Sequence, residues 1–147
     1  MLLNIFAEPV TSLLNQKRKT LKKQSTTLKM NYPTLLQQAL EFRSAFSIPN
    51  GRAHRKKQKS LIDEEWSEFH EAYHHEPRDH VLKELADLVY VCYQFAANEG
   101  WNLDEALDRV HKSNMSKLDE NGQPVLRADG KVLKGPNYKP PHLGDLI

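Results

Sequence analysis

Apolar side chains recur at helical spacing through the middle of the chain, which indicates consecutive amphipathic helices. Pro33 is placed to open the first helix, and the turn-forming run Ile48-Pro49-Asn50-Gly51 ends it. The third helix is apolar over more than half of its circumference, so we expect it to be the most buried. The pattern predicts an all-α bundle of four to five helices. The last three are expected over residues 61–75, 79–98 and 103–115.

The C-terminal part of the chain differs in character. Asn-Gly at 121–122 and Asp-Gly at 129–130 are tight-turn signals beside short apolar runs, so we expect a small β-hairpin followed by an extended, proline-rich arm. Such a tail cannot form a core alone and should lie across the helical body or a partner subunit. The expected divisions are a basic, flexible leader (1–30), a helical domain (31–117), and the hairpin and arm (118–147).

Two acidic pairs, Glu65-x-x-Glu68 and Glu84-x-x-Asp87, interrupt the apolar faces of the second and third helices. Because a helical residue advances by about 100°, Glu65 falls on the apolar stripe of its helix and Glu84 on that of the next. Carboxylates are almost never fully buried without a partner. The conflict between charge and apolar surroundings marks both pairs as candidate functional groups.

Four carboxylates between packed helices would repel one another. At about 5 Å and an effective dielectric of about 20, each like-charged pair costs about 3 kcal/mol, which is large against the margin by which domains are folded. A divalent cation is the simplest neutralising partner. Oxygen-only ligands at helical i, i+3 spacing suit a hard ion such as Mg²⁺ or Mn²⁺.

Three segments, LIDEEWSEFHEAY, KELADLVYVCYQF and HKSNMSK, resemble motifs of the MazG-like all-α nucleoside triphosphate pyrophosphohydrolases. That superfamily also includes dimeric dUTPases and phosphoribosyl-ATP pyrophosphohydrolase, and the resemblance covers roughly residues 33–117. It implies a catalytic domain in which paired carboxylates bind Mg²⁺ or Mn²⁺. The matching positions are Glu65, Glu68, Glu84 and Asp87, with Glu64 beside them as a possible substitute.

The resemblance implies hydrolysis of a nucleoside triphosphate to the monophosphate and pyrophosphate, with water attacking the α-phosphorus. A carboxylate that is not a metal ligand would accept the proton of this water, and Glu65 and Glu68 both remain candidates for that catalytic role. The tail GKVLKGPNYKPP is similar to that of phage-encoded MazG-like proteins. This similarity favours dGTP or another deoxynucleotide as substrate, and phosphoribosyl-ATP is the alternative. The relatives also imply a homodimer or homotetramer.

Substrate-binding residues are expected after the acidic motifs. The family's Asn-x-x-Lys pattern is matched by Asn114 and Lys117, and Asn114 returns to the inner face of its helix if the helix continues. In the tail, Lys131, Lys134 and Tyr138 are placed either to close over a nucleotide or to pin the arm. We take Lys134 and Tyr138 as candidate substrate contacts.

A basic run precedes the second helix and could bind phosphate, although a solvated charge run explains it equally well. Its members are Arg52, Arg55, Lys56, Lys57 and Lys59.

His70-Glu71-Ala72-Tyr73-His74 matches the His-Glu-x-x-His pattern of zinc peptidases. The helical wheel places both histidines on the solvent face, away from the apolar stripe. A peptidase also needs a third ligand, for which Glu99 is the loosely spaced candidate. The pattern therefore favours adventitious zinc binding over catalysis.

Composition and charge bear on the possible partners and location of the protein. The chain has 147 residues and a net charge of +2, but residues 1–30 alone carry +5, so the rest carries −3. A non-catalytic module that binds nucleic acid through its basic segments is a second alternative, although aromatic side chains that would stack on bases are absent from those segments. The opening apolar run is too short to span a bilayer and lacks the charge order of a secretory signal. These features, together with a single cysteine, fit the cytoplasm, or the host cytoplasm if a phage encodes the protein.

Overall fold

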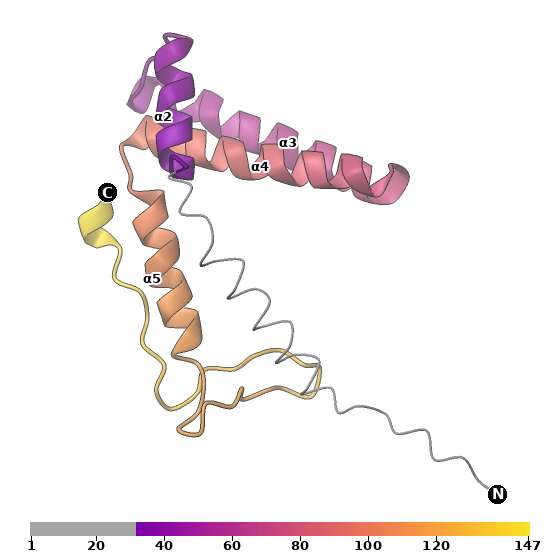
Figure 1. Cartoon of the computed structure of the whole chain (residues 1–147), viewed down its shortest axis with the longest axis vertical. Helices are drawn as coiled ribbons and strands as arrows, with labels where there is room; N and C mark the ends of the chain where they lie inside the picture. Colours follow the sequence, from indigo (N-terminus) through magenta and orange to yellow (C-terminus); the bar gives the residue numbers. More distant parts are fainter. Residues whose placement is uncertain (1–31) are drawn as a thin grey trace, which may run out of the picture. The chain divides into compact units, whose positions relative to one another are not determined.

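The computed structural model describes residues 32–147, which contain four α-helices and no sheet. The predicted all-α class is confirmed. The predicted leader, residues 1–30, lies outside the described residues. Among the described residues no helix has the length and apolarity needed to cross a membrane. The helices, coloured along the chain in Figure 1, are α2 (Leu35–Ala45), α3 (Arg55–His75), α4 (Arg78–Glu99) and α5 (Leu103–Met115).

Local capping chemistry sets three of the helix ends in the described part of the chain. The Thr34 side chain accepts a hydrogen bond from the backbone N–H of Gln37 at 3.2 Å, and the Gln37 side chain accepts one from the Thr34 N–H at 2.8 Å. This capping box starts α2 two residues after the predicted proline. Helix α4 ends at Gly100, whose φ of 76° suits glycine, and Asn102 caps α5. The predicted bounds of α5 are confirmed.

Helix α3 begins six residues earlier than predicted. The basic run forms a short 3-10 turn, Arg52–His54, and then the first turns of α3. Its lysine, arginine and glutamine residues are good helix formers. Because they are polar, the pattern of apolar residues did not reveal this part of the helix. Arg55 also donates from Nε to Glu99 at 2.7 Å, which ties the start of α3 to the end of α4.

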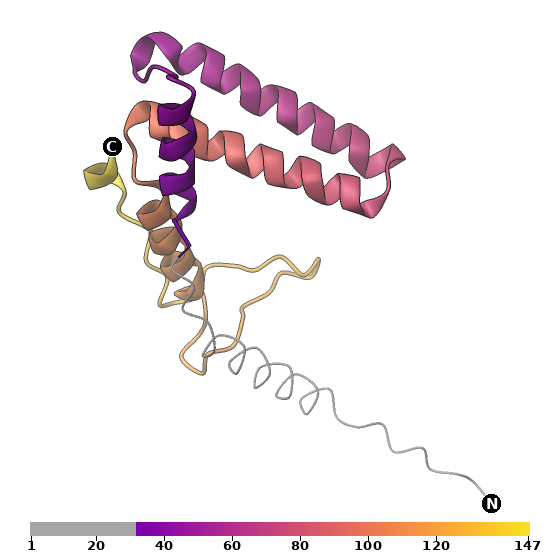
Figure 2. The same ribbon diagram turned by 45° about the horizontal axis from the view of Figure 1, so that its top comes forward.

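Helices α3 and α4 run antiparallel beside each other, and α2 lies across α4 (Figure 2). The core of the described residues is small and centres on Ala39, Tyr93 and Ala97, with Leu36 and Leu103 packed against it. No large side chain among the described residues is completely buried. Much of the apolar surface of this bundle therefore stays exposed in the single chain.

A buried arginine holds α2 to α4. Arg43 is 3% exposed, and its guanidinium donates to the Asn50 side chain at 2.5 Å, the Pro49 carbonyl at 2.7 Å and the Asn98 side chain at 3.2 Å. It also donates to Gln94 at 3.3 Å. Because these acceptors are neutral, burial lowers the pKa of Arg43 from its usual value. The network fixes the loop after α2 against the last turns of α4.

The predicted C-terminal β-hairpin is wrong. Residues 118–147 contain turns at Gly122 and Gly130, but only two isolated antiparallel bridges, Leu118 with Pro124 and Leu126 with Val132. Proline cannot donate to a strand ladder, and a lone pair of strands without a packed apolar face is marginal. The remaining arm runs along α5 (Figure 1), where Ser113 Oγ donates to the Lys139 carbonyl at 2.8 Å.

We predict that Arg43→Met lowers the free energy of unfolding by about 3 kcal/mol, because several buried acceptors lose their donor together. Chemical denaturation followed by circular dichroism measures the change. The control Arg78→Met replaces an exposed arginine in the first turn of α4 and should change stability by less than about 0.5 kcal/mol. Equal stability of the two variants would contradict the structural role of Arg43.

Candidate metal centre

Three of the four predicted metal ligands come together between α3 and α4. One carboxylate oxygen from each of Glu65, Glu84 and Asp87 lies within 4.8 Å of the others. The i, i+3 spacing places Glu84 and Asp87 on one face of α4, and the antiparallel packing brings Glu65 of α3 opposite them. Glu84 is 9% exposed, which confirms its predicted inward orientation, and the other two are half-buried.

Glu68, the fourth predicted ligand, is exposed and lies outside this group of three. It follows Glu65 by one turn of α3 and is close enough to raise the pKa of that carboxyl. Glu64, the possible substitute, is also exposed. The structure therefore shows that three of the four carboxylates form a cluster and that Glu68 lies near it but outside it. The spacing of the motifs alone could not make this distinction.

Sequence reasoning missed Lys83, the cation at this cluster. Its ammonium nitrogen lies 3.0 and 3.1 Å from the two oxygens of Glu84 and 2.9 Å from Asp87 Oδ2. The signal was present in the sequence, because Lys83 precedes Asp87 by four residues and so faces it on the helix.

The cluster remains short of positive charge. Burial raises the pKa of Glu65 above its ordinary value, and the charges of Glu68, Asp87 and Glu84 raise it further, while Lys83 opposes them. One ammonium faces three clustered carboxylates. A divalent cation would supply the missing charge without adding a proton.

The donor set fits a hard divalent cation. All three donors are carboxylate oxygens, the ligands that Mg²⁺ and Mn²⁺ prefer. Opposite ligands of an octahedral Mg²⁺ lie about 4.2 Å apart, and the oxygens here lie within 4.8 Å. Side-chain movements of about half an ångström would bring them within that limit, and Lys83 already shows that a cation is accommodated beside two of them.

The four predicted substrate-binding residues form a second group at the end of α5. Lys117 Nζ donates to Asn114 Oδ1 at 2.7 Å, and Lys134 lies over the Tyr138 ring at 4.5 Å from its centroid. The Gly135 N–H donates to the Lys117 carbonyl at 3.1 Å, which joins the two pairs. Asn114 is exposed rather than on the inner face of its helix as the sequence predicted.

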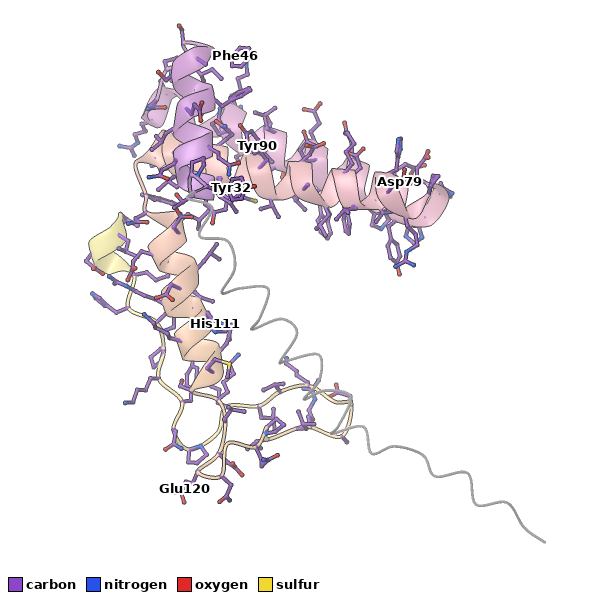
Figure 3. The ribbon with its side chains drawn as sticks, viewed as in Figure 1. Tyr32, Phe46, Asp79, Tyr90, His111 and Glu120 are labelled. Carbon is purple, nitrogen blue, oxygen red and sulfur yellow. The ribbon has the colours of Figure 1, made fainter. Side chains whose placement is uncertain are left out.

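The two groups lie on separate arms of the chain. Asp87 is about 18 Å along α4 from the end of that helix, and Asn114 is about 17 Å along α5 from its start. Asp79, near the α3–α4 turn, and His111 on α5 mark these arms in Figure 3. The acidic cluster and the Asn114 group do not meet within one chain.

The basic run lies at the start of α3 and in the turn before it, away from Glu65. Arg55 pairs with Glu99, and Lys59 donates to Asp63 at 2.6 and 2.7 Å. Arg55 is about 15 Å from Glu65 along the helix. Surface ion pairing thus accounts for these two basic residues without a bound phosphate.

The zinc-peptidase alternative fails on geometry. His70 and His74 are exposed, with ring centroids 4.8 Å apart, as the helical wheel predicts. Glu99, the candidate third ligand, pairs with Arg55, which is about 22 Å from His70 along α3. These residues therefore cannot form a three-ligand zinc site within the chain.

The fold and cluster together define an all-α protein whose adjacent antiparallel helices bring three carboxylates into one group. The family model of phosphoribosyl-ATP pyrophosphohydrolase matches residues 32–114, more than half of the chain, and the chain belongs to this family. The family is part of the MazG-like all-α nucleotide pyrophosphohydrolase superfamily, as the sequence motifs indicated. The matched region includes both acidic pairs and Asn114 but ends before Lys117. No curated protein matches the chain.

We predict that burial of Glu65 and its repulsion by the neighbouring carboxylates make the metal-free protein less stable as pH rises. A carboxyl whose pKa is raised on folding keeps its proton in the folded state while the unfolded state releases it, so stability falls above about pH 4.5. In EDTA, Glu65→Gln should remove this contribution and raise the unfolding midpoint at pH 7 by about 3 °C. Thermal unfolding from pH 4 to 8 measures the difference.

The control for this experiment is Glu64→Gln, which removes the exposed neighbouring carboxylate. It should leave the pH dependence close to that of the wild type. If the two glutamine variants have the same profile, the clustered carboxylates do not strain the fold.

Proposed function

We propose that the protein hydrolyses the anhydride bond between the α- and β-phosphates of a nucleotide, releasing a nucleoside monophosphate and pyrophosphate. The observation that carries this proposal is the carboxylate cluster of Glu65, Glu84 and Asp87 in a chain of the phosphoribosyl-ATP pyrophosphohydrolase family. The proposed substrate is a deoxynucleoside triphosphate such as dGTP. This choice rests on the tail GKVLKGPNYKPP, which resembles phage-type relatives and would place the enzyme in the host cytoplasm.

Phosphoribosyl-ATP is the second candidate substrate, because the matching family carries that name. Both substrates present the same bond to the same carboxylates. The acidic cluster therefore supports the reaction, and the groups that contact the base and sugar must decide the substrate.

The acidic residues take different parts in the proposed mechanism. Glu65, Glu84 and Asp87 would hold Mg²⁺ or Mn²⁺, which when bound lowers the pKa of a water molecule and neutralises phosphate charge. Glu68, exposed and outside the three, is free to accept the proton of the attacking water. Its separation from the cluster favours Glu68 over Glu65 as the general base.

The group at the end of α5 would bind the nucleotide. Lys117 and Lys134 provide ammonium groups for phosphate oxygens, Asn114 provides an amide, and Tyr138 provides an aromatic ring. Lys134 covers one face of that ring, so a base would have to displace the lysine in order to stack on that face.

We further propose a homodimer or homotetramer in which α5 of one copy completes the acidic cluster of another. The distance between the two groups along α4 and α5 supports this arrangement. So does an apolar groove of about 320 Å³ on α4, lined by residues that include Leu82, Leu85 and Val89. These three side chains are 66%, 43% and 42% exposed, which favours a partner over this face.

A substrate panel tests the reaction. With Mn²⁺ or Mg²⁺, the wild type should convert a triphosphate to the monophosphate and pyrophosphate, and Glu68→Gln and Asp87→Asn should each lower kcat by about 10²- to 10⁴-fold. The control Glu71→Gln, on the solvent face of α3, should retain turnover. Turnover of phosphoribosyl-ATP alone would select the second substrate, and no hydrolysis of any nucleotide would refute the proposal.

The position of attack has its own readout. In ¹⁸O-labelled water, attack at the α-phosphorus puts the label in the monophosphate, whereas label in the pyrophosphate would indicate attack at the β-phosphorus.

Subunit complementation tests the shared site. Asp87→Asn and Lys117→Ala should each be inactive alone, but a mixed dimer would contain one site with both residues intact. Random mixing by co-refolding should then restore about a quarter of the wild-type activity. Sites formed within one chain would give no recovery, and light scattering on the same samples would establish the oligomeric state.

A further inference from the structure

Lys83 makes contacts of an unusual kind for a surface lysine. Its ammonium touches both oxygens of Glu84 and one of Asp87, at 2.9 to 3.1 Å. On the neighbouring helix, Lys59 bonds Asp63 alone, on the solvent face. Lys83 thus engages two of the three clustered carboxylates with a single charge.

We propose that Lys83 is a built-in competitor of the metal ion, which occupies the carboxylate oxygens of the cluster until a divalent cation displaces it. The inference rests on the proposed function, because it concerns the regulation of the same cluster. Its consequence is that wild-type metal affinity is lower than the three carboxylates would otherwise provide, so that the cluster fills only when the cation is abundant or arrives with a nucleotide.

The contacts of Lys83 leave little room for joint occupancy. The ammonium lies against both oxygens of Glu84, so a metal bonded to either oxygen would lie close to a second positive charge. Two positive ions bound to the same carboxylate would repel each other at short range. Exchange of one cation for the other avoids this repulsion.

Lys83 is also able to leave. Its side chain is 58% exposed, whereas that of Glu84 is 11% exposed. The lysine stem is flexible and its ammonium is readily hydrated, so release into water exposes no buried group. The buried carboxylate stays in place, and the mobile cation is the part that moves.

Mn²⁺ binding tests the competition. Isothermal titration calorimetry and the electron paramagnetic resonance signal of free Mn²⁺ would be measured for the wild type and Lys83→Met, which keeps the stem and removes the charge. We expect Lys83→Met to bind Mn²⁺ about tenfold more tightly. The matched control Lys59→Met removes the same charge from Asp63 and should keep the wild-type affinity. Lys83→Arg retains a cation and should show no gain.

Thermal unfolding gives a second readout, which also reports the stability of the metal-free protein. In EDTA, Lys83→Met should unfold at a lower temperature than the wild type, because the carboxylates lose their counter-ion. Saturating Mn²⁺ should stabilise the variant more than the wild type and bring the two midpoints together. A role of Lys83 in packing alone would leave the variant less stable with and without metal.

The outcomes separate this inference from the proposed function. If the wild type binds Mn²⁺, Asp87→Asn abolishes binding and Lys83→Met binds no more tightly than Lys59→Met, then the competition is refuted and the metal centre stands. If neither the wild type nor any variant binds Mn²⁺, both the competition and the metal centre are refuted. Tighter binding by Lys83→Met alone, together with converging midpoints, supports the exchange.

Discussion

Electrostatic repulsion between α3 and α4 is the constraint on which the structure of this protein depends. The antiparallel pair brings the carboxylates of Glu65, Glu84 and Asp87 together, and one ammonium offsets part of their charge. A compact pair of apolar faces would be the more stable solution at these positions. The arrangement is tolerable because two of the three carboxylates are half-buried and remain partly screened by water. The same unbalanced charge is what gives the cluster its capacity for a divalent cation.

Helix α4 contributes to two different surfaces of the bundle. Its inner face carries the carboxylates toward α3, while Leu82, Leu85 and Val89 leave an apolar surface without cover in the described chain. The small core around Ala39, Tyr93 and Ala97 gives the bundle limited internal support, and the Arg43 network adds polar contacts between α2 and α4. If a second copy covers α4 and also brings its α5 to the acidic cluster, as we propose, then both the stability and the activity of the protein would depend on this association.

The α5 arm has a different physical basis. Beyond Leu103, which packs against the core, it is held by hydrogen bonds between α5 and the tail, such as those that link Arg109 to Asp145. The hydrogen bonds raise the pKa of Arg109 and hold that of Asp145 below its usual range. These exposed ion pairs fix the path of the arm but contribute little stability individually. The group at the end of α5 that we propose to bind the nucleotide is supported in this way, so it would adjust to a ligand more readily than the carboxylates on two packed helices.

The sequence by itself determined the all-α class, the bounds of α5 and the inward orientation of Glu84, because helical periodicity and capping act within a few residues. Tertiary structure decided the rest. It brought Glu65 to the carboxylates of α4 and left Glu68 outside, because this difference depends on side-chain directions across two helices. It also extended α3 through the basic run, reduced the expected hairpin to two bridges and separated Asn114 from the carboxylates. Spacing along the chain fixes which face a residue occupies, but the distance between faces is set only when the helices pack.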